Sequence, residues 1–518
     1  MRRSWVGTRL IGLLVSGLVC AACGGGSSSA KPPVPTSFGL LSTIQLPNLN
    51  GKPAILTSFD ISWFDNFKGG ENVYFTDSGN NALDQVNTAN NTFVQYINAG
   101  GFGGANSFRN FDCNGPNGVI TAIGPNDSFH EAWVGDISGA TKTNCDTATP
   151  KPVLWAFDLT KNPPVPVTFP NNIANPIDVS CGVNGLTPIS GDPTSPTLNP
   201  PACPTAGVAP LDRADELAYD SKDDVILIAT PHPAPGLYNA NTNPAGCATA
   251  PGQNCGPYVS IVQAGTGQVL GQIVFPQADG GLEQSQWYAA NDTFYLNLPS
   301  DTDLGKDANG NEIGGVAQIK INSVNPLNVT VTVPTSASAP FSQVVSCGAT
   351  GMAIESDGDL FLGCPNALTP NPAFPPPFPT TPGPAANFAE VMNISTGQIV
   401  AAPFGNLSAA DEVWFDSFNG LNAESGLNGV LSFIDEATNQ IGASFLASPG
   451  IPSPPPHSIT ADSVNGHIIV PGPANSESWD NSASLTVLPG STQPGDFTCT
   501  KGCVWVFGPS PNNSYPVE

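Results

Sequence analysis

The sequence is poor in basic residues. Of its 518 residues, 15 are Lys or Arg and 41 are Asp or Glu, which gives a formal net charge of −26. Nucleic acids and anionic lipids need a positively charged surface, so we expect neither as a partner. Charged residues make up only 11% of the chain, whereas Gly (55) and Pro (54) are abundant. This composition disfavours a helical fold and indicates short strands with many turns.

Motifs for metal or redox chemistry are also scarce. The four histidines are scattered, and there is no CxxC pair, no CxxCH haem attachment and no GxSxG turn. Zinc bound by thiolates, haem or copper electron transfer and a serine hydrolase of the GxSxG type are therefore not expected.

A short apolar run near the N-terminus follows Arg2, Arg3 and Arg9 and extends from Leu10 to Val19. It is too short for a stable membrane span and has the layout of an export signal. Small residues then precede Cys23.

This layout resembles a bacterial lipoprotein signal, although Cys20 occupies the position usually held by leucine. The resemblance implies a signal peptide over 1–22 and an acylated Cys23 as the mature N-terminus. The alternative is a plain secretory signal. Residues 23–37 read as a flexible tether, so we expect an extracytoplasmic protein of the cell envelope, held at the membrane by an N-terminal lipid.

Ten cysteines follow Cys23. An even number in an exported chain indicates disulfides, and pairing of sequence neighbours costs the least loop-closure entropy. The predicted pairs are Cys113 with Cys145, Cys181 with Cys203, Cys247 with Cys255, Cys347 with Cys364, and Cys499 with Cys503.

The chain repeats itself. ADELAYD at 214–220 returns as ADEVWFD at 410–416, with looser copies at 59–65, 282–288 and 457–462. Each copy is followed by further β-rich runs, and this pattern defines seven units. The units begin near Ile61, Gly118, Asp215, Glu283, Gly351, Asp411 and Ser458. The second unit is expected to close with a strand over Val165–Phe169.

The last unit lacks one strand, and an isolated strand at 38–47 can supply it. Closing the ring in this way removes the open sheet edges. We therefore predict an all-β seven-bladed β-propeller over 38–509, with a tail at 510–518. Six or eight blades remain alternatives, because the second strand of the sixth unit is faint between Asp416 and Gly429.

Several segments resemble the YVTN and NHL propellers of exported bacterial proteins. They include VSIVQAGTGQVLGQIVFP at 259–276, CGATGMAIESDGDLFLGC at 347–364 and YFTDSGNNALDQVNTANNTF at 74–93. The resemblance covers about 38–509 and implies the fold rather than an activity, because such propellers include binding scaffolds and enzymes.

The long insertions all join the second strand to the third or one blade to the next. Those connections lie on one face of a propeller, the face at which the inner strands begin, and the ten cysteines fall in or beside them. Insertions on one face mark a binding face. We expect an unknown protein or small-molecule ligand there.

The start of each inner strand borders the central opening. The repeat places Asp60, Asp215, Glu283, Asp411 and His457 there, with Glu216, Gln284 and Glu412 one step further and Arg213 just before. Converging carboxylates repel one another, which raises their pKa values or recruits a cation. Ca²⁺ or another divalent cation held by Asp215, Glu283, Asp411 and His457 is one prediction.

Two other interpretations of these residues remain open. The acids can have a structural role, bonding the backbone of the neighbouring blade. The architecture is also similar to that of gluconolactonase-like and virginiamycin lyase-like propellers, so a metal-dependent lyase or lactonase with its site at the central opening is the alternative function. The favoured function is a membrane-tethered binding module.

Overall fold

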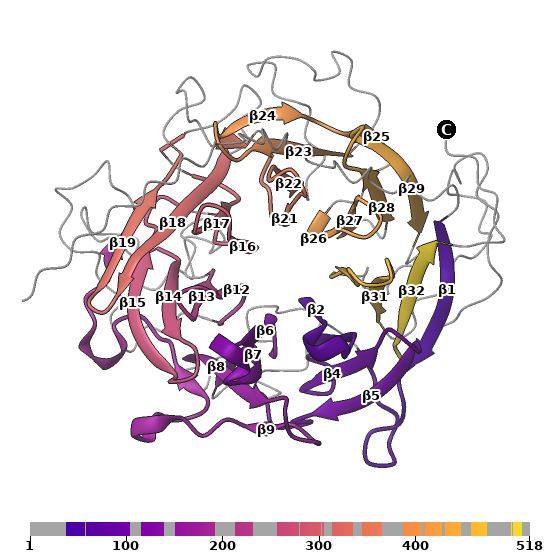
Figure 1. Cartoon of the computed structure of the whole chain (residues 1–518), viewed down its shortest axis with the longest axis horizontal. Helices are drawn as coiled ribbons and strands as arrows, with labels where there is room; N and C mark the ends of the chain where they lie inside the picture. The colour runs from indigo at the N-terminus through magenta and orange to yellow at the C-terminus, as the bar shows by residue number, and fades with distance from the viewer. Residues whose placement is uncertain are drawn as a thin grey trace, which may run out of the picture.

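The computed structural model describes residues 38–56, 59–103, 115–138, 151–191, 213–231, 256–278, 280–301, 303–304, 313–334, 344–345, 347–364, 387–405, 407, 410–426, 430–446, 457–473, 499 and 501–509. These residues form seven sheets arranged around a central axis (Figure 1). The chain is therefore an all-β seven-bladed propeller, as predicted. Within the described ranges no helix has the length and apolar character needed to cross a membrane.

Six blades follow one another along the chain, each numbered from the inner strand outward. Blade 1 is β2 (Ser62–Asp65), β3 (Asn72–Asp77), β4 (Ala82–Asn87) and β5 (Thr92–Ile97). Blade 2 is β6 (Val119–Ile123), β7 (His130–Ser138) and β8 (Lys151–Asp158), edged by β9 (Val165–Pro166) and β10 (Ile177–Asp178). Blade 3 is β12 (Leu217–Asp220), β13 (Val225–Thr230), β14 (Tyr258–Gln263) and β15 (Gln268–Val274), with β11 (Ile189–Ser190) at its edge.

The next three blades keep this plan. Blade 4 is β16 (Ser285–Tyr288), β17 (Thr293–Leu298), β18 (Gly314–Val324) and β19 (Leu327–Thr332), with β20 (Val344–Val345). Blade 5 is β21 (Met352–Ile354), β22 (Leu360–Gly363), β23 (Asn387–Asn393) and β24 (Gln398–Ala401), with β25 (Phe404–Gly405). Blade 6 is β26 (Ala410–Asp416), β27 (Leu421–Gly426), β28 (Val430–Asp435) and β29 (Gln440–Leu446).

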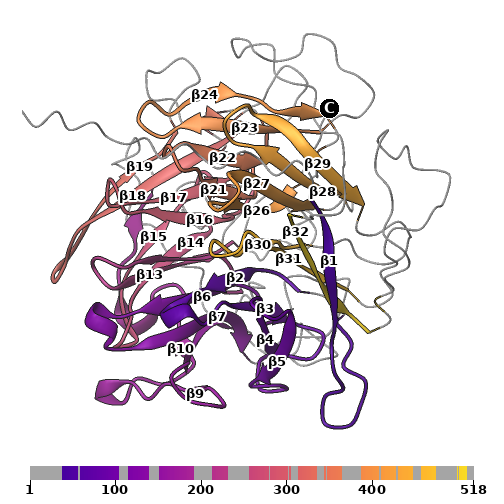
Figure 2. The same cartoon turned by 45° about the vertical axis from the view of Figure 1, so that its right-hand side comes forward.

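Blade 7 closes the ring with strands from both ends of the chain. It consists of β30 (Thr460–Ala461), β31 (Ile468–Gly472) and β32 (Cys503–Pro509), and β1 (Phe38–Gln45) lies outside β32. Figure 2 shows β1 running beside β32. The two strands pair antiparallel from Phe38 opposite Pro509 to Gln45 opposite Cys503. This confirms the predicted closure.

The core lies between adjacent blades. One cluster joins Ile44 and Val504 of blade 7 to Phe75 of blade 1, all at most 6% exposed. Burial of apolar area is the main favourable term in folding, so this seam stabilises the closed ring.

In three copies of the repeat, the last aspartate holds a tight turn. Asp220, Asp416 and Asp462 each end or follow an inner strand, and one Oδ1 of each accepts the backbone N–H groups two and three residues later, at 2.8–3.3 Å. Such Asx turns let a short side chain replace a backbone partner. This requirement explains why the repeats end in Asp.

Three details qualify the predictions. The fourth strand of blade 2, expected at Val165–Phe169, is instead split between β9 and β10, because a turn at Pro170–Asn172 interrupts it. The faint second strand of blade 6 is β27, fully buried and paired on both sides. The disulfides Cys347–Cys364 and Cys499–Cys503 are formed as predicted.

The other predicted pairs involve residues outside the described ranges: Cys113, Cys145, Cys203, Cys247 and Cys255. Cys181 is disulfide-bonded, and its predicted partner, Cys203, is among those residues.

Candidate functional site at the mouth of the ring

Equivalent backbone hydrogen bonds define which residues surround the opening. In blade 3 the N–H of Asp215 donates to the carbonyl of Ala229, whose own N–H donates to the carbonyl of Glu216. The same pair of bonds occurs at Glu283 and Gln284 in blade 4. Blades 2 and 5 repeat it, and the strand register extends it to blades 1, 6 and 7.

We call the residues at the first of these positions the upper ring and those at the second the lower ring. The upper ring is Asp60, Asn117, Asp215, Glu283, Thr350, Asp411 and His457. The lower ring is Ile61, Gly118, Glu216, Gln284, Gly351, Glu412 and Ser458. Every predicted ligand-binding residue belongs to one of these two rings. We call the two rings, with Arg213, the mouth, and the face on which it lies the top face.

His457 lies between two carboxylates from other blades. Its Nε2 is 2.7 Å from Oδ2 of Asp411, and its Nδ1 is 3.3 Å from Oδ1 of Asp60. Burial alone lowers the pKa of His457, but the two carboxylates raise it well above its ordinary value. The imidazole of His457 is therefore a bound imidazolium at neutral pH, with both of its nitrogens facing carboxylates, rather than a free general base.

Arg213 is paired with Asp215. Its Nε and Nη2 donate to Oδ2 of Asp215 at 2.9 and 2.7 Å, and the two side chains are 14% and 1% exposed. Burial raises the pKa of Asp60, but His457 and Arg213 outweigh it and lower that pKa to about 2. Asp60 is thus an anion held by two cations.

Other acids of the mouth are protonated more easily. Burial, opposed by Arg213 and reinforced by Asp60, raises the pKa of Asp215 to about 8. Burial followed by the charge of Glu412 raises the pKa of Glu216 well above its ordinary value. Burial and the nearby Asp411 do the same for Glu283 and Glu412. The acids are therefore close enough to influence one another across the ring, as the repeat predicted.

Gln284 of the lower ring makes the kind of contact that was predicted for the acids, a hydrogen bond to the backbone of a neighbouring blade. Gln284 accepts the N–H of Met352 at 2.5 Å and donates to the carbonyl of Val413 at 3.2 Å, so it links blades 4, 5 and 6. Sequence analysis placed Gln284 at this level of the ring without assigning it this role.

Sequence analysis missed the contribution of blades 2 and 5. Gly118 and Gly351 occupy the lower ring there, and a Cβ on Gly118 would lie 1.8 Å from the carbonyl oxygen of Asp215. On Gly351 it would lie 2.5 Å from a side-chain carbon of Val413. These glycines allow the close strand approach that brings the acids together. Their equivalent place in the repeat is the sequence feature that could have revealed this role.

Indole rings lie below the acids. Three residues beyond Asp60 and Asp411 along the chain, Trp63 and Trp414 meet edge to face with their centroids 4.9 Å apart. They come from blades 1 and 6, so the contact joins two blades that are separated by blade 7. Both also pack against residues of adjacent blades.

A trio of carboxylates suited to a metal lies elsewhere. Among the described residues, the ligand atoms of Asp220, Asp223 and Asp292 lie within 4.8 Å of one another, and the mouth residues form no such group. Asp220 ends β12, Asp223 follows that strand, and Asp292 directly precedes β17. All three therefore lie on the face opposite the mouth. Lys222 contacts Asp292 and lies 3.9 Å from Asp223, so a cationic side chain already neutralises part of the trio. The divalent cation predicted at the mouth stays a prediction.

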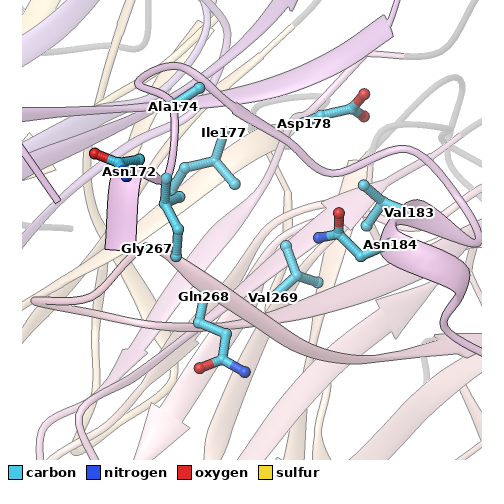
Figure 3. Close-up of a pocket in the computed structure, with 10 residues that line it drawn as sticks. Asn172, Ala174, Ile177, Asp178, Val183, Asn184, Gly267, Gln268 and Val269 are labelled. Carbon is cyan, nitrogen blue, oxygen red and sulfur yellow. The ribbon is translucent and has the colours of Figure 1, made fainter. Parts of the chain in front are cut away.

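A pocket of about 320 Å³ lies at the outer rim (Figure 3). It is formed between the segment after β9 and the start of β15, with Ile177 and Val269 on its walls and Asp178 at its edge. Asp178 is paired with Lys151 at 2.7 Å. The pocket contains no residue of the mouth.

No protein-family model matches the chain. No curated protein matches it either.

Proposed function

We propose that this chain is a membrane-tethered, extracytoplasmic propeller of the YVTN and NHL type that binds a ligand at its mouth and top-face loops. The observation that supports a binding role is the mouth itself. Five of the seven upper-ring positions are ionisable, and Asp60, Asp411 and His457 from three blades meet within hydrogen-bonding distance. Propellers commonly act as binding modules through such a face.

The direction of β1 supports an outward-facing mouth. Inner strands begin at the top face, so β31 ends there, β32 begins there, and β1, antiparallel to β32, begins at the bottom. Fourteen residues separate Cys23 from Phe38. If Cys23 is acylated, the tether to the membrane is attached at the bottom face. The mouth and the predicted disulfide-linked loops then point away from the membrane.

The chemistry of His457 favours binding over catalysis. A general base needs an unprotonated nitrogen near neutral pH, and a metal ligand needs a free lone pair. Both nitrogens of His457 face carboxylates instead. A metal-dependent lyase or lactonase is therefore the second candidate function, after a binding module.

A thermal-shift panel tests the proposal. Sugars, lactones, amines and divalent cations are added to the native protein, to Asp411→Asn, and to Asp357→Asn as a control with the same charge change in the exposed turn between β21 and β22 on the bottom face. We expect a stabilising compound whose effect is lost only in Asp411→Asn. Equal stabilisation of all three proteins by every binding compound would contradict a mouth site, and turnover of a lactone would support the enzyme.

The membrane tether has its own test. Mass spectrometry of the exported protein is expected to show an acylated N-terminus at Cys23. An unmodified N-terminus at another residue would contradict the lipid tether and would support a plain secretory signal instead.

A further inference from the structure

We propose that the ligand group bound at the mouth is an organic nitrogen cation, a primary ammonium or a guanidinium, held by the carboxylates of Glu283, Asp215 and Glu412. This inference rests on the proposed binding function and names its ligand class.

The mouth already holds two cations of this kind. The imidazolium of His457 bridges Asp411 and Asp60 from different blades, and the guanidinium of Arg213 binds Asp215. All four nitrogen–oxygen distances lie between 2.7 and 3.3 Å, as expected for charge-assisted hydrogen bonds. The spacing of the rings is therefore suited to N–H donors placed between carboxylates.

The two cations do not satisfy the acids of the mouth. Six carboxyl groups belong to the rings (Asp60, Asp215, Glu216, Glu283, Asp411 and Glu412), against Arg213 and His457. Full ionisation would leave four negative charges. Burial and mutual repulsion raise the pKa values of the acids Asp215, Glu216, Glu283 and Glu412, and an added cation would favour their ionised forms by offsetting that repulsion.

Two buried oxygens point to the missing donors. Oδ1 of Asp215 and Oε2 of Glu412 are buried, in residues 1% and 3% exposed, and receive no N–H donor within the described part of the molecule. Each acid interacts instead with another carboxyl group, Asp215 with Asp60 and Glu412 with Glu216. Buried acceptors almost always have a partner, so these two oxygens are positions at which the N–H groups of a ligand can bind. Besides burial, Asp215 and Glu412 both raise the pKa of Glu216, and Asp215 also raises that of Glu283, so these acids belong to one cluster.

An N–H donor fits this arrangement better than a bare metal ion. Ca²⁺ needs six to eight oxygens at about 2.3–2.6 Å. The mouth residues lack a group of three ligand atoms within 4.8 Å of one another, the spacing found on the opposite face at Asp220, Asp223 and Asp292. A larger cation with directed N–H groups spans wider gaps between carboxylates.

Titration calorimetry with agmatine, which carries one guanidinium and one ammonium, tests the inference. Tetramethylammonium, a cation without N–H groups, and Ca²⁺ are the comparison probes. We expect agmatine to bind, tetramethylammonium to bind at least about tenfold more weakly, and Glu283→Gln to weaken agmatine by about tenfold or more, because a charged hydrogen bond is lost. Asp223→Asn should leave agmatine binding unchanged, which excludes general attraction to an acidic protein.

The other outcomes overturn the inference. Equal binding of agmatine and tetramethylammonium would mean that charge alone is recognised. Ca²⁺ binding that is lost in Glu283→Gln, with no binding of agmatine, would replace the organic cation by a metal. If agmatine fails but another compound loses its thermal shift in Asp411→Asn, the mouth remains a binding site and only the ligand class is wrong.

Discussion

Replacing His457 by glutamine tests the paired imidazolium at the mouth. The substitution removes a cation from between Asp60 and Asp411 and leaves two neighbouring carboxylates without it. Each lost charged hydrogen bond contributes about 1.5–3 kcal/mol when fully desolvated. The His457, Asp60 and Asp411 side chains are 21%, 15% and 17% exposed, so we discount the sum for solvent screening to about 2–3 kcal/mol.

The pH dependence of this loss follows from the direction of the pKa shift. The pKa of His457 is raised above 6.5 in the folded protein. Its contribution is therefore fully present below about pH 6.5 and is lost as the pH rises through the folded-state pKa. The difference in unfolding free energy between the native protein and His457→Gln should be largest at pH 5–6 and should shrink toward alkaline pH.

Urea denaturation of both proteins from pH 5 to pH 9 measures this difference. His467→Gln is a matched control in the same blade, because burial lowers the pKa of His467. The contribution of His467 is present at high pH and is lost as the pH falls below about 6.5, so its trend should be opposite. A constant difference for His457→Gln across the range, or none at all, would refute the paired imidazolium.

Three further predictions concern the ring itself. The double variant Cys347→Ala/Cys364→Ala should lose about 3 kcal/mol of unfolding free energy in denaturant titration, from a loop with a sequence separation of 17; no loss would mean that the bond adds no constraint. Deleting 38–45 should expose β32 as an open edge and give oligomers in size-exclusion chromatography, whereas a monomer with native melting would contradict closure by β1. Gly118→Ala should lower the melting temperature more than Gly51→Ala, because a Cβ on Gly118 meets the carbonyl of Asp215 whereas Gly51 has open space and only a positive φ of 76°; equal effects would refute the close approach.

The repeat and its spacing predicted most of the fold. Blade number and closure by the N-terminal strand follow from the alternation of apolar runs and turns, and the two disulfides follow from the pairing of cysteines that are neighbours in the sequence. The fourth strand of blade 2 was misplaced because Pro and Asn after Val165 allow either a strand or a turn, and only pairing with β8 decides between them. Strand β27 was faint because its sequence, LNAESG, lacks β-branched residues and is specified by burial instead.

For the mouth, the sequence predicted the positions but not the pairing. Alignment of the repeats placed Asp60, Asp411 and His457 at equivalent positions on three blades. It could not show that His457 faces both carboxylates, because that contact joins blades 1, 6 and 7 across almost 400 residues of chain. The choice between a metal ligand and a bound imidazolium is made by this tertiary geometry.

The pairing of β1 with β32 also governs when the protein can fold. The first strand to be synthesised has its partner more than 450 residues later, so blade 7 cannot assemble until the last strand has been made. Contacts of such long sequence separation form slowly. Until then β1 has no partner strand and is open to pairing with other chains, so each nascent chain carries an unpaired strand until its last blade has been made.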